Sequence, residues 1–183
     1  KLESMRTLLA ACPQSEQSRA LSMETPDNST ALHYAATSGN AELVKLILGA
    51  LPESQTRQSV ADMSSEYEHT LLHCAVDSGN VETIKLVLNL YPETQYLQAV
   101  SMIGVLHRAA SAHSHESIQF LLSFFSVSQH LQVMGMRDEE GDTVLHYAAG
   151  ASRSASIQFL LALLPESQRL QAVNMCIELG RTV

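Results

Sequence analysis

The dipeptide Leu-His occurs four times along this 183-residue chain, and no other feature constrains the fold as strongly. Its histidines are His33, His73, His107 and His146, so successive copies lie 40, 34 and 39 residues apart. Self-similarity with a period of about 20 to 50 residues is the signature of a stacked repeat architecture. The sequence therefore predicts an array of similar units, in which each unit contacts its neighbours, rather than one closed core.

The residues around the first copy read as two short helices joined by a tight turn. Thr30 can cap the first helix, because its hydroxyl can accept a hydrogen bond from an otherwise unpaired N–H of the first turn. A glycine and then Asn40 follow, which suits the end of one helix and the cap of the next. The second helix keeps Glu42 and Lys45 outside and places its apolar residues with the i, i+3, i+4 spacing of a buried stripe: Leu43, Val44, Ile47, Leu48 and Leu51.

A third segment follows each pair of helices and lengthens the repeat. In most copies it opens with a proline, which is favoured at a helix start because its missing N–H would have been unpaired there. Leu97 and Val100, like Leu170 and Val173, then lie three residues apart on one face. We expect a short third helix in each repeat, packed against the stack, within residues 51–63, 90–102, 124–136 and 163–175.

The repeats together form a single predicted domain over residues 1–183. We expect both ends to fall inside a repeat, so the sequence reads as a fragment of a longer protein with apolar end faces. The expected divisions are a partial repeat at 1–23, full repeats at 24–63, 64–102, 103–136 and 137–175, and the start of a further repeat at 176–183.

These residues resemble the ankyrin repeat, whose pattern is G-x-T-P-L-H-x-A-A-x-x-G-x-x-x-x-V-x-x-L-L. The likeness is clear in the first, second and fourth repeats and weaker in the third. It implies an all-α ankyrin-repeat solenoid, here with a short extra third helix per repeat. Long, divergent repeats of this kind are similar to those in effectors that intracellular bacteria deliver into host cells. The chain departs from the pattern at Ala31, Leu71, Val105 and Val144, where proline is usual, and at Asn28 and Glu68, where glycine is usual.

Composition excludes several classes of partner. The net charge is −8 with only 11 Lys and Arg residues, which argues against nucleic acid, because phosphate binding needs clustered cations. No apolar run approaches the roughly 20 residues that span a bilayer, so we expect no membrane interaction. Cys12, Cys74 and Cys176 are odd in number and lack a C-x-x-C pair, which favours a reducing compartment. We expect a cytoplasmic protein, located in the host-cell cytoplasm if it is a secreted bacterial effector.

The chemistry of the sequence favours binding over catalysis. No G-x-S-x-G, P-loop or C-x-x-C motif is present, so we expect no enzyme activity, catalytic residue, cofactor or metal ion. Four repeated imidazoles leave a metal site as an alternative, but zinc needs ligands at roughly 2 Å around one point. Helices packed at about 10 Å would hold the imidazoles too far apart. The resemblance implies instead that they hydrogen-bond to the backbone of the hairpins.

The resemblance also identifies the usual contact surface, which consists of the hairpin tips and the exposed end of each first helix. Most of the corresponding side chains are acidic or small, which suits a monomeric module that recognises a partner protein with a basic surface. The alternative is that Asp138, Glu139 and Glu140 form a merely solvated hairpin. The candidate partner-binding residues are Asp27, Ser29, Thr37, Ser38, Glu66, Tyr67, His69, Asp77, Ser78, Ser111, Glu139, Glu140, Asp142 and Ala151.

Three other roles stay open at the level of sequence. The repeats could be the targeting arm of a larger multidomain enzyme or bacterial effector whose catalytic domain lies outside these residues. They could also associate with each other through uncapped ends. The Leu and Val residues of the third helices would form a second docking ridge if they remained exposed.

Overall fold

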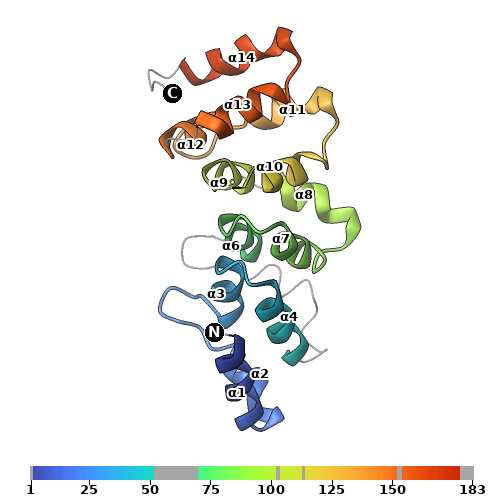
Figure 1. Cartoon of the computed structure of the whole chain (residues 1–183), viewed down its shortest axis with the longest axis vertical. Coiled ribbons are helices and arrows are strands. Elements are labelled where there is room, and N and C mark those ends of the chain that lie inside the picture. The colour runs from blue at the N-terminus through green and yellow to red at the C-terminus, as the bar shows by residue number, and fades with distance from the viewer. Residues whose placement is uncertain (1, 52–69, 102–103, 113, 152–153, 178–183) are drawn as a thin grey trace. The chain divides into compact units, whose positions relative to one another are not determined.

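The structure is a computed structural model that describes residues 2–51, 70–101, 104–112, 114–151 and 154–177. Within these residues the regular elements are short helices (Figure 1). They group into two compact bodies, formed by residues 1–93 and 94–183.

In the N-terminal body, α1 and α2 correspond to the second and third helices of a repeat. Two pairs, each made of a first and a second helix, follow them. The first helix α3 packs against its own second helix α4 and against the next first helix α6, and α6 packs against α7 (Figure 1). Helices α1 and α2 contact α4. The bounds are α1 Leu2–Ala11, α2 Gln14–Leu21, α3 Ala31–Thr37, α4 Ala41–Ala50, α6 Leu71–Asp77 and α7 Val81–Leu88. A 3₁₀ turn, η1 at Glu93–Gln95, includes the last residue of this body and the first two of the next.

The C-terminal body repeats the same order of helices. Its first helices α9 and α12 pack against each other and against their second helices α10 and α13, while α14 contacts α11, α12 and α13. Its bounds are α8 Tyr96–Val100, α9 Val105–Ser111, α10 His115–Leu122, α11 Val127–Met134, α12 Val144–Gly150, α13 Ser154–Ala162 and α14 Glu166–Ile177.

Local sequence explains where the second helices begin. The side chain of Asn40 accepts a hydrogen bond from the Leu43 N–H at 3.0 Å, and the side chain of Asn80 accepts one from the Thr83 N–H at 3.0 Å. Ser114 caps α10 in the same way. Each cap satisfies one of the N–H groups that the first turn of a helix leaves unpaired. The predicted cap at Asn40 is thereby confirmed.

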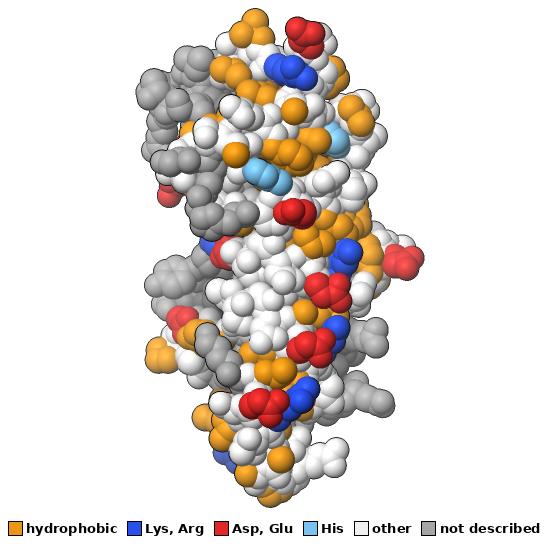
Figure 2. Space-filling model, viewed as in Figure 1, with side chains coloured by type: hydrophobic (Ala, Val, Ile, Leu, Met, Phe, Trp, Pro, Cys, Tyr) orange, Lys and Arg blue, Asp and Glu red, His pale blue; other side chains and the backbone are white. Residues whose placement is uncertain are grey.

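The predicted stripe of α4 is largely confirmed. Leu43, Val44 and Ile47 are buried, whereas Leu48 and Leu51 are only half-buried because they lie near the end of the helix. The opposite face is charged, and Figure 2 shows acidic and basic side chains alternating over α4 and α7. The Lys45 ammonium lies 3.1 Å from a Glu42 carboxylate oxygen and 3.7 Å from a Glu82 oxygen. These exposed pairs contribute little free energy, and they keep this face solvated.

The third helices expected within residues 90–102, 124–136 and 163–175 are present as α8, α11 and α14, and α2 has the corresponding place in the partial repeat at 1–23. The third helix expected within residues 51–63 lies outside the described residues. In three of the described third helices a side chain reaches back to a carbonyl eight residues earlier, near the end of the second helix. Gln17 donates to the Leu9 carbonyl at 2.7 Å, His130 approaches the Leu122 carbonyl at 3.3 Å, and Arg169 donates to the Leu161 carbonyl at 3.0 Å. Since the last carbonyls of a helix lack intrahelical partners, these contacts cap the second helix and fix the third helix against it.

The packed face of the third helices differs from the prediction. Val100 is buried as expected, but Leu97 is 47% exposed and Leu170 is 70% exposed. The residues that face the interior are Ala99 with Val100 in α8 and Ala172 in α14. The prediction holds for Val100 and is wrong for Leu97 and Leu170, because i, i+3 spacing leaves two side chains some 60° apart on the helix and the buried strip of a surface helix is narrow.

Candidate partner-binding surface

The Leu-His histidines hold the starts of the first helices. In α3 the backbone N–H of Thr30 donates to Nδ1 of His33 at 3.1 Å, and the two residues form a capping box in which imidazole replaces the usual Glu or Gln. The same arrangement joins Thr70 to His73 at 3.2 Å and Thr143 to His146 at 3.0 Å. The implied hydrogen bonding of the histidines to backbone is therefore present.

The third repeat lacks this box, because Gly104 stands where the other repeats have threonine. Gly104 adopts φ +97°, a value that a residue with a side chain rarely adopts. The His107 imidazole is buried, and its Nε2 lies 3.0 Å from the carbonyl oxygen of Met136. This contact ties α9 to the segment that opens the next hairpin.

That hairpin is a tight turn over residues 138–142. The Asp138 N–H donates to the Asp142 carbonyl at 3.0 Å, and the Gly141 N–H donates to the Asp138 carbonyl at 3.0 Å. The Asp138 carboxylate also accepts from the backbone N–H groups of Glu140 at 3.0 Å and Asp142 at 2.8 Å. Gly141 adopts φ +84°, so glycine suits this corner. Backbone and carboxylate together fix the shape of the turn.

Two side chains fix the turn to the surrounding helices. The Tyr147 hydroxyl of α12 donates to the Asp138 carboxylate at 2.8 Å, and its ring meets the His107 ring edge-on with centroids 5.2 Å apart. Arg137 donates to the carbonyls of Gly141 at 2.9 Å and Met175 at 2.8 Å. The turn is therefore held by contacts with α9, α12 and α14.

The same contacts shift two pKa values. Burial and the hydrogen bond to Asp138 raise the pKa of Tyr147 to about 12. Partial burial acts to raise the pKa of Asp138, but the hydrogen bonds from Tyr147 and from the Asp142 backbone outweigh it and hold that pKa below its ordinary value. Asp138 is thus ionised at neutral pH, and its carboxylate is held in place by these hydrogen bonds.

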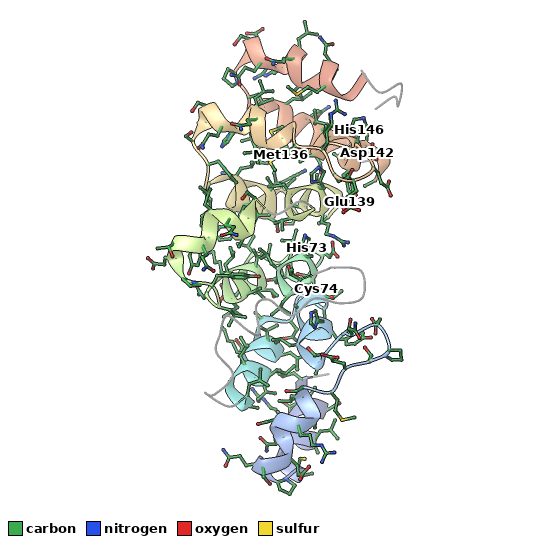
Figure 3. The ribbon with its side chains drawn as sticks, turned by 180° about the vertical axis from the view of Figure 1, so that it is seen from behind. His73, Cys74, Met136, Glu139, Asp142 and His146 are labelled. Carbon is green, nitrogen blue, oxygen red and sulfur yellow. The ribbon has the colours of Figure 1, made fainter. Side chains whose placement is uncertain are left out.

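The tip of this turn presents the candidate acidic side chains. Glu139 and Glu140 are exposed, whereas Asp142 is half-buried. Figure 3 labels Glu139 and Asp142 on the segment leading into α12, which carries His146. We call residues 138–142 the acidic turn.

The first repeat contains a turn of the same design over residues 25–29. The Thr25 N–H donates to the Ser29 carbonyl at 2.9 Å, and Asn28 takes the glycine corner with φ +57°. Asp27, however, accepts hydrogen bonds from the hydroxyls of Thr25 and Ser29, which lower its pKa. Ser29 is buried. This turn therefore keeps its one carboxylate occupied within itself, whereas the acidic turn has two further carboxylates, Glu139 and Glu140, that are exposed.

The candidate residues at the first-helix ends form small, locally satisfied surfaces. The hydroxyls of Ser38, Ser78 and Ser111 donate to the carbonyls of Ala35, Ala75 and Arg108, three residues earlier, and Thr37 donates to the His33 carbonyl. Asp77 is exposed, and Ala151 is half-buried. Glu66, Tyr67 and His69 lie outside the described residues.

Sequence reasoning missed the residues that immobilise the acidic turn, Arg137 and Tyr147, and it treated Asp138 only as part of a solvated hairpin. The sequence does contain a signal for the role of Asp138, since Asp followed three residues later by Gly, here Gly141, is a common β-turn pattern. The pairing with Tyr147 had no local signal, because it joins residues nine positions apart through tertiary packing.

The described residues contain neither a cluster of metal-ligating side chains nor a membrane-spanning helix. No group of three or more His, Cys, Asp or Glu side chains there could hold a metal ion. None of the helices in that part of the chain is long and apolar enough to cross a membrane.

Comparison with known proteins identifies the repeat. The family model for ankyrin repeats in three copies matches residues 1–99, and the one for ankyrin repeats in many copies matches residues 106–161. The chain is also similar to the crystal structure of the human ASB11 ankyrin repeat domain, with a TM-score of 0.60 and 17% identity over 88% of this chain. It spans 62% of that chain's length, and at this identity the likeness shows the fold alone. No curated protein matches the chain.

Proposed function

Because the chain belongs to the ankyrin repeat family, whose domains generally act as protein–protein interaction modules, we propose that it binds a partner protein through its hairpin turns and the exposed ends of its first helices. In the C-terminal body we assign the contact to the acidic turn and to the adjoining ends of α9 and α12. The partner then presents a basic segment.

The observation that carries this proposal is the fixed geometry of the acidic turn. Three helices hold it through His107, Arg137 and Tyr147, while Glu139 and Glu140 remain exposed at its tip. A surface that is ordered in advance loses little conformational entropy on binding. Exposed carboxylates on such a surface act mainly on the encounter rate and on discrimination between partners.

A non-catalytic, monomeric role in a reducing compartment such as the cytoplasm fits this proposal. Asp138 and Tyr147, the titratable pair with the clearest shifts in this region, hold each other in a fixed hydrogen bond. The hydroxyls of Ser111 and Ser78 donate hydrogen bonds to helix carbonyls, which suits residues of a contact surface better than nucleophiles. Shape and charge are then the means of recognition.

The test is capture of proteins from eukaryotic lysate by the parent chain and by a Glu139→Lys, Glu140→Lys variant. We expect the variant to lose the specific partner, and raised salt to weaken capture by the parent. A matched control, Glu93→Lys with Glu166→Lys, makes the same change in net charge at two exposed residues, one before α8 and one at the start of α14, and should retain the partner. Equal capture by all three proteins would remove the acidic turn from the proposal.

A further inference from the structure

Two second helices of the C-terminal body share a run of six identical residues. The sequence Ser-Ile-Gln-Phe-Leu-Leu occurs at 117–122 in α10 and again at 156–161 in α13. The core accounts for part of this run, because the serine and the first leucine are buried in both helices. In both helices, however, the glutamine is exposed and the phenylalanine is only half-buried. Core packing therefore does not explain why Gln-Phe recurs.

The outer face of these helices differs in charge from that of the second helices in the N-terminal body. Where α10 and α13 have Gln-Phe, α4 and α7 have Lys-Leu, at residues 45–46 and 85–86. The helices α8, α10, α11 and α13 contain one Asp, Glu, Lys or Arg side chain, that of Glu116. Figure 2 shows mainly uncharged side chains over α10 and α13, several of them hydrophobic. The same part of the repeat is thus a charged surface in one body and an uncharged, aromatic surface in the other.

The half-buried rings on this surface form two clusters, and α10 contributes to both. The Phe120 and Phe124 rings meet edge-on with centroids 5.4 Å apart, and Phe124 meets Tyr96 of α8 in the same way at 6.0 Å. The His115 ring stacks on that of Phe159 in α13 with centroids 5.1 Å apart. All five side chains are half-buried. We call these five residues the aromatic face.

Two exposed apolar side chains lie next to the aromatic face in the chain. Leu97 follows Tyr96 in α8 and is 47% exposed, and Val127 begins α11 and is 59% exposed. Exposed apolar surface of this kind marks interaction sites, and aromatic residues are enriched among the anchors of protein interfaces. The aromatic face is therefore a candidate docking surface.

The charge of the surface indicates the chemistry of its occupant. Glu116 is exposed in the first turn of α10, where its carboxylate accepts a hydrogen bond from the Ser114 hydroxyl at 3.1 Å. A second copy of the chain would bring a like net charge of −8, and an anionic lipid surface would be repelled by the same charge. A cation set among apolar side chains complements this surface.

The spacing of the rings indicates the form of the occupant. Phe120 and Phe124 lie about 6 Å apart along the axis of α10, and apolar residues at i, i+4 on another helix have the same spacing. We propose that the aromatic face is a docking site for a basic amphipathic helix of a partner protein, whose apolar side chains pack on Phe120 and Phe159 and whose Lys or Arg lies against Glu116. This site lies on the second helices and is separate from the acidic turn.

The probe is a fluorescein-labelled peptide of about 15 residues, roughly four helical turns, with leucines at i, i+4 spacing on one face and lysines at one end. Fluorescence anisotropy measures its affinity for the parent chain and for two test variants. Phe120→Ala with Phe159→Ala removes the two recurring rings. Gln119→Lys with Gln158→Lys leaves the rings in place and gives both helices the exposed lysine of α4 and α7.

Each test variant has a matched control. Leu46→Ala with Leu86→Ala makes the equivalent truncation at the half-buried residues of α4 and α7. Glu139→Gln with Glu140→Gln changes the net charge as the two added lysines do, but at the acidic turn. Measurements at about 0.15 M salt limit the reach of charges outside the site to about 8 Å. Thermal melting shows whether each variant is folded.

We expect the parent to bind the peptide and both controls to keep that affinity. Removal of the two rings should weaken binding by about tenfold or more, because truncation of an interface anchor costs at least that much. The two added lysines should weaken it several-fold through repulsion of the basic peptide.

The proposal would be overturned if the parent failed to bind, if the truncation variant matched its control, or if the added lysines had no effect. Loss of binding in the Glu139→Gln, Glu140→Gln variant would also overturn it, because the acidic turn would then hold the basic peptide. A dimer of the parent in light scattering that the truncation variant lacks would make a second copy the occupant. Sedimentation of the parent, and not of that variant, with phosphatidylcholine–phosphatidylserine vesicles would make a lipid surface the occupant, and either result would contradict the proposal.

Discussion

At the residue scale, the histidine that defines the repeat serves as a structural clamp at the start of its helix. His33, His73 and His146 each accept a backbone hydrogen bond through Nδ1. His107, which has Gly104 in place of the capping threonine, uses Nε2 to hold the Met136 carbonyl. A histidine suits both tasks because its two ring nitrogens point in different directions, so it can join a helix start to a neighbouring segment.

The capping box allows a direct measurement at Thr30, which is buried. Thr30→Ala removes the hydroxyl half of the box, and we expect it to lower the free energy of unfolding by about 1 kcal/mol, within the usual range for N-caps. Thr30→Ser keeps the hydroxyl and should change stability much less. Urea denaturation compares the two variants, and equal stability of Ala and Ser at this position would show that the hydroxyl contributes nothing.

The Tyr147–Asp138 hydrogen bond has a defined pH dependence. Since the Tyr147 pKa is raised from 10.0 to about 12, its contribution to stability is complete below pH 10.0 and is lost as the pH rises through about 12. Asp138 behaves in the opposite sense. Its pKa is lowered from 3.8, so its contribution is complete above that pH and is lost as the pH falls further below it.

Tyrosinate absorbance tests this assignment, with Tyr147→Phe identifying the signal of Tyr147. We expect that signal to appear near pH 12 in the parent, and Asp138→Asn to move it toward 10 because the negative charge beside the phenol is removed. A Tyr147 that titrates at its ordinary value in the parent would contradict the hydrogen bond that holds the acidic turn.

At the element scale, the turn between the first and second helices contains a left-handed glycine in the first two repeats, Gly39 and Gly79. Gly39 adopts φ +65°, and a Cβ placed there would lie 3.3 Å from the Cβ of Ser78 and 3.4 Å from that of Asn80, in the next repeat. The turns of successive repeats are therefore stacked closely, and the left-handed conformation adds its own cost for any other residue.

We expect Gly39→Ala to lower the free energy of unfolding by about 1 to 2 kcal/mol, because it combines left-handed strain with that close approach. Gly49 is the matched control, since it lies inside α4 with open space around the position of a Cβ. Gly49→Ala should raise stability by about 0.5 to 1 kcal/mol through helix propensity. Thermal or urea denaturation measures both, and a shift of the same sign for the two variants would contradict this account.

At the scale of the whole molecule, the repeat architecture separates the proposed binding surface from the core. The buried stripes of the second helices and the small faces of the first helices form the core of each body, and the third helices cap the second helices through Gln17, His130 and Arg169. The proposed contact residues Glu139 and Glu140 are exposed and take no part in that core, so our proposal allows their side chains to vary with the partner. The acidic turn is a local specialisation of a generic frame.

The sequence by itself determined the helices, their caps and the family, because these depend on residues only three or four positions apart or on a motif repeated along the chain. Asn40 and Thr30 are examples in which local chemistry was sufficient. Tertiary structure alone decided which apolar side chains are covered. Leu8 and Leu160 occupy the same place in their helices, yet only Leu160 is buried. Burial is set by what lies opposite a side chain. The hydrogen bond from Tyr147 to Asp138 and the one from Arg137 to the Met175 carbonyl likewise form only in the folded chain, since each joins segments that no local pattern relates.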